Sequence, residues 1–334
     1  MEQRKVKWGI LGTANIARWA TIPGMKKADN CELYAIAGRS PAKAQSFAEQ
    51  YGIAKAYGSY DELLADPLVQ AVYIPLPNDL HLPWVTKALA AGKHVLCEKP
   101  LALNASEARE MYRTARENGV ILMEAYAYLH SPYVESLKRD VASGIIGEVD
   151  YIDTSFVTQG YTEDFRLHKE HGGGAMYDLG CYCTTMILSL VDDEVASVNA
   201  SAEFTDLGVD MLTTAQMRFK GGARAAFTVG MNLGISSNSR FDRLYIHGSK
   251  GSIRSDVEYN QEGTLRYTIY AREGLADGTP AGGITREVFA LQNYALEIEQ
   301  LGRCILEGET PHITEEFSVK NAEVIDRVLA AVGY

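Results

Sequence analysis

The chain up to residue 124 alternates short apolar runs with amphipathic stretches. The apolar runs are rich in β-branched residues, and the segments between them repeat apolar residues at helical spacing. This order is typical of an α/β fold in which a doubly wound parallel sheet carries helices on both faces. The predicted strands are Val6–Leu11, Cys31–Ala37, Ala71–Leu76, His94–Glu98 and Val120–Glu124, with a shorter strand near 55–57.

Two of the intervening segments carry signals for helix boundaries. Ser40 stands before Pro41, and Gly52 follows the last apolar position, as expected for an N-cap, a first helical residue and a helix end. Asn104 and Glu107 resemble a capping box at the start of another helix. Both signals agree with the apolar periodicity, so they support the doubly wound sheet.

The pattern changes after Glu124, where strands no longer alternate with helices. We therefore expect an α+β domain with an open-faced, mostly antiparallel sheet. A polar, Gly-rich stretch over 162–174 has the composition of a loop that covers a site. The predicted elements are a helix over 133–143, strands over 148–159, 195–204, 211–219, 224–231 and 240–247, and a last helix over 318–332.

These patterns predict a division of the chain into domains. We expect a dinucleotide-binding Rossmann domain over 1–124 and a substrate-binding and oligomerisation domain over 125–317. A C-terminal helix over 318–334 is expected to pack back toward the first domain.

The turn after the first strand is a candidate dinucleotide site. Gly12 begins a loose glycine fingerprint in which Ala14 and Ala17 replace the second and third glycines. A tight turn aimed at a helix N-terminus suits a pyrophosphate, although the same turn without a ligand is the alternative. The predicted cofactor contacts in this turn are Gly12, Thr13, Ala14, Asn15 and Ile16.

The end of the second strand indicates which cofactor is preferred. NAD enzymes usually carry an acidic residue there, but this chain has Gly38, Arg39 and Ser40, with Lys43 one helical turn later. Arg39 and its neighbours suit the 2′-phosphate of NADP, so we expect NADP, with NAD possible. The alternative is that Arg39 is an exposed charge at a helix start.

Two segments follow strands at the edge where such a sheet binds its ligands. One contains Pro75, Leu76, Pro77, Asn78 and His81. The other contains Glu98, Lys99 and Pro100. Lys99 lies between an apolar strand and a proline, which should direct its side chain into the crevice. Alternatively, it pairs with Glu98 or faces solvent.

Composition narrows the classes of partner. The 334 residues include 32 Lys and Arg against 43 Asp and Glu, a formal charge of -11, which disfavours nucleic acid. Apolar runs are too short for a membrane span, and the charged N-terminus does not resemble a signal peptide. Five cysteines form no paired framework and have no zinc-like spacing, so we expect a cytoplasmic protein without a metal.

Several segments together resemble the Gfo/Idh/MocA family of oxidoreductases. The segments that carry this resemblance, which covers nearly the whole chain, are the strand-turn-helix start, YIPLPNDLH, HVLCEKPLALN, MEAYAY and GGGAMYDLGCY. The resemblance implies a nicotinamide cofactor, and a substrate held between a Rossmann domain and an open-sheet domain. In this family, Asn78 and His81 fall on the nicotinamide side of the crevice, although His81 equally suits a structural role.

The resemblance also assigns catalytic roles. The family's catalytic lysine falls on Lys99, and its aspartate with a tyrosine four residues later falls on Asp178 and Tyr182. The tyrosine resembles the branch of glucose-fructose oxidoreductase, dimeric dihydrodiol dehydrogenase and xylose dehydrogenases. Tyr126 and Arg166 match positions that address substrate, an exposed loop arginine being the alternative for Arg166. Leu129 replaces an arginine common in that branch, so the resemblance does not name the substrate.

These residues predict a dehydrogenase or reductase. Tyr182 would exchange a proton with the substrate oxygen, Lys99 would favour its phenolate, and Asp178 would orient a substrate hydroxyl. We expect a sugar, cyclitol or vicinal diol as substrate, and a homodimer or homotetramer. The alternatives are a redox-assisted glycosidase that uses NAD and a non-catalytic NAD(P)-binding regulator.

Overall fold

The chain folds into two compact units. The computed structural model describes residues 4–234, 240–271 and 283–334. One unit comprises Met1–His130 and Gln292–Ala322, and the other comprises Ser131–Leu291 and Glu323–Tyr334. Residues 292–322 thus belong to the first unit, whereas the sequence pattern placed most of them in the second domain.

The first unit is built on a six-stranded parallel sheet in the order β3-β2-β1-β4-β5-β6. The order reverses between β1 and β4, which creates the switch point where such sheets bind ligands. This confirms the predicted doubly wound sheet. The strands are β1 Val6–Leu11, β2 Cys31–Ala37, β3 Lys55–Tyr57, β4 Ala71–Ile74, β5 His94–Glu98 and β6 Leu122–Ala125.

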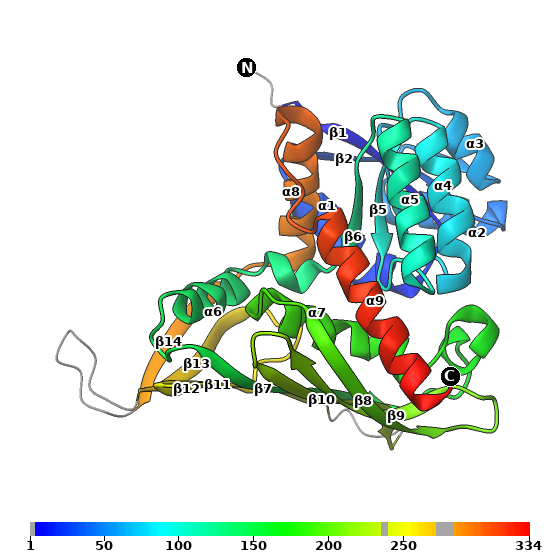
Figure 1. Ribbon diagram of the computed structural model, residues 1–334. Helices are drawn as coiled ribbons and strands as arrows, with labels where there is room; N and C mark the ends of the chain where they lie inside the picture. Colours follow the sequence, from blue (N-terminus) through cyan, green and yellow to red (C-terminus); the bar gives the residue numbers. More distant parts are fainter. Residues whose placement is uncertain (1–3, 235–239, 272–282) are drawn as a thin grey trace. The chain divides into compact units, whose positions relative to one another are not determined.

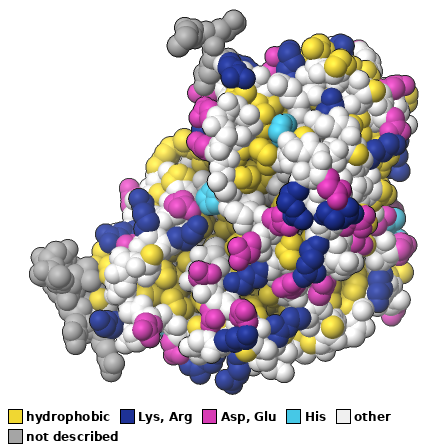
Figure 2. Space-filling view, turned by 45° about the horizontal axis from the view of Figure 1, so that its top comes forward, with side chains coloured by type: hydrophobic (Ala, Val, Ile, Leu, Met, Phe, Trp, Pro, Cys, Tyr) yellow, Lys and Arg dark blue, Asp and Glu magenta, His cyan; other side chains and the backbone are white. Residues whose placement is uncertain are grey.

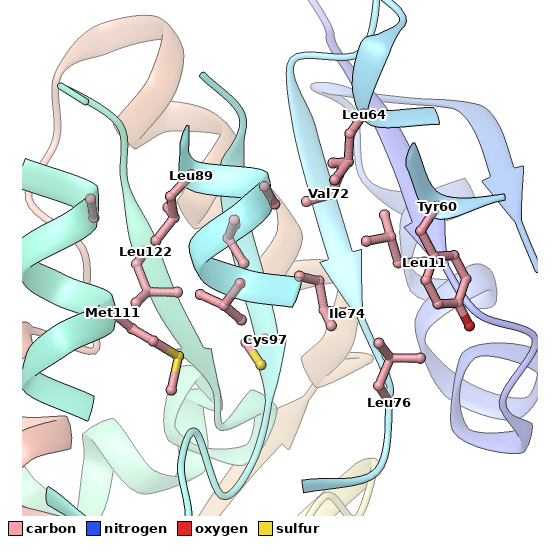
Figure 3. Close-up of a cluster of buried hydrophobic side chains, with 14 of the residues drawn as sticks. Leu11, Tyr60, Leu64, Val72, Ile74, Leu76, Leu89, Cys97, Met111 and Leu122 are labelled. Atoms are coloured by element: carbon pink, nitrogen blue, oxygen red, sulfur yellow. The ribbon is translucent and has the colours of Figure 1, made fainter. Parts of the chain in front are cut away.

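Helices cover both faces of this sheet. Consecutive side chains of a strand point to opposite faces, and here the apolar side chains on both faces are buried. Leu11, Val72 and Cys97 pack against the apolar stripes of α3, α4 and α5 (Figure 3). The opposite face, which includes Tyr73, meets α1 and α8 (Figure 1). The helices of this unit are α1 Ile22–Lys27, α2 Pro41–Tyr51, α3 Tyr60–Ala65, α4 His81–Ala90, α5 Ala105–Glu117 and α8 Asn293–Glu307.

The second unit contains an eight-stranded sheet in the order β14-β13-β12-β11-β7-β10-β9-β8. Every pair is antiparallel except β7 with β10, so the predicted mostly antiparallel sheet is confirmed. The strands are β7 Val149–Gln159, β8 Val195–Phe204, β9 Asp210–Phe219, β10 Arg224–Leu233, β11 Phe241–Gly248, β12 Gly251–Ser255, β13 Gly263–Ala271 and β14 Gly283–Ala290.

Helices lie on one face of this sheet, and Figure 1 shows the opposite face without a helix in the described part of the chain. The helices are α6 Pro132–Ala142 and α7 Cys181–Leu190. Arg327, near the end of α9 Glu315–Val332, donates to the backbone oxygen of Ala196 in β8. The uncovered face carries the exposed rings of Phe241, Tyr270 and Phe289.

Candidate active site

The fingerprint turn after β1 has the geometry that a dinucleotide requires. Gly12 has a φ of 122°, a conformation that other residues rarely adopt, and its N–H donates to the oxygen of Ala37 at 2.8 Å. The helix that follows widens into a π-turn, Ala17–Thr21, before α1 begins. Gln292 at the start of α8 donates to the oxygen of Ala20 in that turn, 3.1 Å away.

The residues expected at the adenosine end lie beside this turn. Gly38 is buried, and a Cβ on it would stand 3.5 Å from Cγ2 of Thr13. Arg39, Ser40 and Lys43 are exposed. Ser40 caps α2 by accepting from the N–H of Lys43 at 3.4 Å, so its side chain already serves the helix.

His81 is fully buried and joins the loops after β4 and β5. Its Nε2 lies 2.8 Å from the oxygen of Leu76, and its Nδ1 lies 3.0 Å from that of Pro100. Burial lowers the pKa of His81, so its ring is favoured in the neutral form. A neutral imidazole has one N–H, so His81 donates to one of the two loops and packs against the other. Pro75, Leu76 and Pro77 form the strand-end loop itself, and Asn78 begins the short helix after it.

Glu98 is the last residue of β5, Lys99 follows it, and the Lys99–Pro100 peptide is cis. Glu98 accepts from the hydroxyl of Tyr73 at 2.5 Å. Glu297 of α8 is buried nearby. Burial first, and then the charge of Glu98, raises its pKa well above the ordinary value. Burial and the neighbouring carboxylate thus both favour the protonated form of Glu297.

Lys99 lies within electrostatic range of a second buried acid, Glu124. Burial raises the pKa of Glu124 to about 7, while hydrogen bonds and the charge of Lys99 oppose the rise. One Glu124 oxygen accepts from the N–H of Leu101 at 2.8 Å. Tyr126 is completely buried, and its hydroxyl accepts from Asn321 at 3.1 Å, so its side chain lies inside the first unit.

The second unit holds the remaining predicted residues. Asp178 lies on a π-turn, Met176–Gly180, and Tyr182 lies in the first turn of α7. Arg166 Nε is 2.9 Å from Asp178 Oδ1, and Arg166 Nη1 is 2.9 Å from Asp164 Oδ1. Since Asp178 is buried, this guanidinium stabilises its carboxylate.

Two glycines allow the loop that carries Arg166 to approach Asp178. A Cβ on Gly173 would stand 2.4 Å from the oxygen of Arg166, and one on Gly174 would stand 2.1 Å from Asp210 Oδ1. Asp210 also accepts from the N–H of Met176 at 2.9 Å, which anchors the π-turn. The glycine-rich run after Arg166 is therefore required for this geometry.

Tyr182 lies half-buried among aromatic rings. Its ring centroid is 5.4 Å from that of Phe156 and 5.2 Å from that of Tyr259. The sequence analysis did not identify these two neighbours, nor Arg240 beside them. An arginine at the start of a strand pattern gave no local signal. Glu297 gave none either, because it lies in α8, a helix that the sequence pattern did not predict.

The described residues also bear on membrane, metal and nucleic-acid sites. No helix in the described ranges is long and apolar enough to cross a membrane. Among residues 4–234, 240–271 and 283–334, no three His, Cys, Asp or Glu side chains cluster as metal ligands do. On the face drawn in Figure 2, basic and acidic side chains are interspersed and do not gather into one basic area.

Comparisons with known proteins cover both units. Residues 6–126 match the oxidoreductase family with an NAD-binding Rossmann fold, and residues 134–254 match the GFO/IDH/MocA C-terminal domain. The chain is 32% identical over 323 residues to a D-xylose 1-dehydrogenase (NADP(+)) of Haloferax volcanii, covering 96% of this chain and 95% of that protein.

Two further similarities extend over almost the full length. The trans-1,2-dihydrobenzene-1,2-diol dehydrogenase of Xenopus laevis is 30% identical, and the match covers 98% of both chains. The crystal structure of a 3-ketoreductase from Actinomadura kijaniata, in complex with NADP and TDP-benzene, has a TM-score of 0.88 and 28% identity over 98% of both chains.

Proposed function

Because this chain belongs to the Gfo/Idh/MocA family of NAD(P)-dependent oxidoreductases, we propose that it is a dehydrogenase or reductase that acts on a carbon-bound hydroxyl or carbonyl. The proposed substrate is a sugar, cyclitol or vicinal diol. The names of the xylose dehydrogenase and the dihydrodiol dehydrogenase support this class. The observation that carries the proposal is the buried Asp178, paired with Arg166 one helical turn before Tyr182.

The described residues fit a nicotinamide dinucleotide. The conformation of Gly12 and the helix start behind it suit the pyrophosphate. Arg39, which follows Gly38 beside that turn, is the candidate for the 2′-phosphate of NADP. The residues proposed to hold the cofactor are Gly12, Thr13, Ala14, Asn15, Ile16, Arg39, Ser40, Lys43, Pro75, Leu76, Pro77, Asn78, Glu98 and Lys99. We assign His81 to holding the cofactor loops.

The chemistry divides between hydride transfer and proton transfer. When bound, the nicotinamide accepts or donates the hydride. Tyr182 takes or gives the proton of the substrate oxygen, and Lys99 favours the phenolate by its charge. Asp178, kept ionised by Arg166, accepts a hydrogen bond from a neighbouring substrate hydroxyl.

Tyr126 was expected to address substrate, but its buried hydroxyl bonds to Asn321. We therefore propose that Tyr126 has a structural role inside the first unit. The uncovered face of the eight-stranded sheet, with Phe241, Tyr270 and Phe289, supports a homodimer or homotetramer, which sedimentation would measure.

All five cysteines are buried thiols, which supports the predicted cytoplasmic location.

The test is reduced-nicotinamide absorbance with NADP and NAD in parallel, over a panel of aldoses, cyclitols, diols and dicarbonyls. Turnover should fall about 100- to 10,000-fold in Tyr182→Phe, because the variant lacks the proton-exchanging hydroxyl. Cofactor affinity should change little. An unchanged rate would remove Tyr182 from catalysis.

A different outcome would favour one of the alternative functions. Cofactor binding without turnover on any member of the panel would favour a redox-assisted glycosidase or a non-catalytic regulator. Release of the aryl alcohol from an aryl glycoside would then identify the glycosidase.

A further inference from the structure

Tyr182 belongs to a cluster of three rings in the second unit. Phe156 comes from β7, and Tyr259 from the segment between β12 and β13. Phe156 and Tyr259 stack with centroids 5.2 Å apart and planes 15° apart, and both contact the ring of Tyr182. Rings packed in this way restrict the orientation of the Tyr182 phenol.

A cation lies against this cluster in the second unit. The guanidinium carbon of Arg240, just before β11, is 4.1 Å from the ring centroid of Phe156. Its Nε donates to Asp242 Oδ1 at 2.9 Å, and its Nη2 donates to Asp242 Oδ2 at 2.5 Å and to the oxygen of Tyr259 at 3.2 Å. These bonds fix the guanidinium plane.

Arg240 and Tyr182 interact electrostatically. Burial disfavours the charge of Arg240, but Asp242, Glu258 and the phenol of Tyr182 raise its pKa above the ordinary value. The interaction is reciprocal, because a cation that is stabilised by a phenolate stabilises that phenolate equally.

We propose that Arg240 is a positioning residue that stabilises the phenolate of Tyr182 and, through Phe156, holds its ring in place. This inference rests on the proposed proton-transfer role of Tyr182. It assigns to the second unit a cation of its own for activating the tyrosine, in addition to Lys99 of the first unit.

The other charged and titratable groups around the cluster limit the size of the effect. Asp242 and Glu258 oppose the charge of Arg240 from the segments beside it. The thiol of Cys183 on α7 is neutral at ordinary pH, because burial raises its pKa. The hydroxyl of Tyr259 is engaged with Cys183 Sγ at 3.8 Å and with Thr154 Oγ1 at 3.1 Å.

On the element that carries Tyr182, the preceding turn holds Asp178. Its carboxylate is balanced by Arg166, which also contacts Asp164. These charges are retained in every variant below, so a change in the titration of Tyr182 reports on Arg240.

The experiment is the pH dependence of kcat/KM for alcohol oxidation. In that direction Tyr182 must be deprotonated, so activity rises with pH through its pKa. Arg240→Met should move this limb upward by about one pH unit and lower kcat/KM at neutral pH about tenfold. Arg240→Lys should reverse most of this shift, because lysine restores the positive charge.

Arg243→Met is the matched control. Arg243 lies three residues after Arg240, in β11, and points to the opposite sheet face, where it pairs with Asp153 at 2.6 Å. In Arg243→Met, the rise of kcat/KM with pH should coincide with that of the unmodified protein. A limb that stays in place in Arg240→Met would overturn the inference.

Removing Arg240 leaves the buried Asp242 without its charge partner, which is strongly destabilising. Arg240→Met/Asp242→Asn avoids this, because the Asn oxygen still accepts from the N–H of Tyr259, now 2.9 Å from Asp242 Oδ2. If the single variant does not fold, the double variant is compared with Asp242→Asn, from which it differs only at position 240. The same upward shift is expected between these two variants, and its absence would overturn the inference.

Direct titration separates this inference from the proposed function. The tyrosinate absorbance difference between the unmodified protein and Tyr182→Phe reports the Tyr182 phenol without turnover. A shift of this titration in Arg240→Met supports the electrostatic contact even if Tyr182→Phe stays active, in which case only the catalytic role fails. A titration unchanged by Arg240→Met would reject the contact itself.

Discussion

At the scale of single residues, the preference for a cofactor is predicted to depend on Arg39. Its side chain is exposed, and it follows Gly38, which lies against Thr13 of the fingerprint turn. Ser40 and Lys43 are exposed beside it, but of the three only Arg39 offers a planar fork of donors to a 2′-phosphate. A forked, charge-assisted contact of this kind discriminates strongly between a phosphate and a hydroxyl.

Replacing Arg39 by Ala should therefore weaken NADP binding roughly 10- to 100-fold, the loss expected for hydrogen bonds to a charged group. NAD binding should hardly change. Fluorescence titration with both cofactors measures the effect, and Arg18→Ala, an exposed arginine of the same unit, is the control. Equal weakening for both cofactors would remove Arg39 from 2′-phosphate recognition.

At the scale of elements, the sequence predicted the helix boundaries that local interactions form. Ser40 and Asn104 are the N-caps that the sequence indicated, and Gly52 ends α2 in a left-handed conformation. Helix α8 was missed because Glu297 and Gln300 interrupt its buried apolar stripe. Strands β12, β13 and β14 were also missed, although buried Leu265, Tyr267 and Ile269 in β13 alternate as strand residues do.

The candidate site shows the same limit. Lys99, Asp178 and Tyr182 were identified from short motifs. The contacts of Tyr182 with Phe156, Tyr259 and Arg240 depend on strands distant in sequence. A single chain gives no local pattern for such pairings, so Arg240 became visible only in the folded unit.

The glycine-rich turn before the Asp178 element gives a prediction at this scale. Gly174→Ala should destabilise the protein by about 3 kcal/mol or more, because its Cβ meets Asp210 and a left-handed backbone disfavours alanine. Gly222→Ala is the matched control, since its φ of 104° is close to the 103° of Gly174 but its Cβ would meet nothing.

Chemical denaturation of the two glycine variants separates backbone strain from the contact. The excess loss in Gly174→Ala over Gly222→Ala measures the approach to Asp210. Equal losses would mean that the turn accommodates a side chain.

At the scale of the whole molecule, buried acids make stability depend on pH. Glu124 has a pKa of about 7 in the folded chain, above its ordinary 4.5. The folded state therefore keeps a proton that the unfolded state releases between these values. Stability falls as pH rises through this window, by about 3 kcal/mol for a shift of this size, and the loss is complete above the folded pKa.

Glu124→Gln should remove this dependence, because an amide does not titrate and its oxygen still accepts from the N–H of Leu101. The difference in unfolding free energy between the variant and the unmodified protein should grow by about 3 kcal/mol from about pH 5 to about pH 8. Urea denaturation measures it, with the exposed Glu110→Gln as control. A difference independent of pH would contradict the assignment.

The two π-turns, Ala17–Thr21 behind the cofactor fingerprint and Met176–Gly180 at Asp178, also affect how this chain can vary. A π-turn is equivalent to an α-helix with one residue inserted. Deleting that residue would straighten the helix and rotate everything beyond it by about 100°. Such a deletion would turn Tyr182 away from its rings, so single-residue length changes in these turns should be rarer in evolution than substitutions.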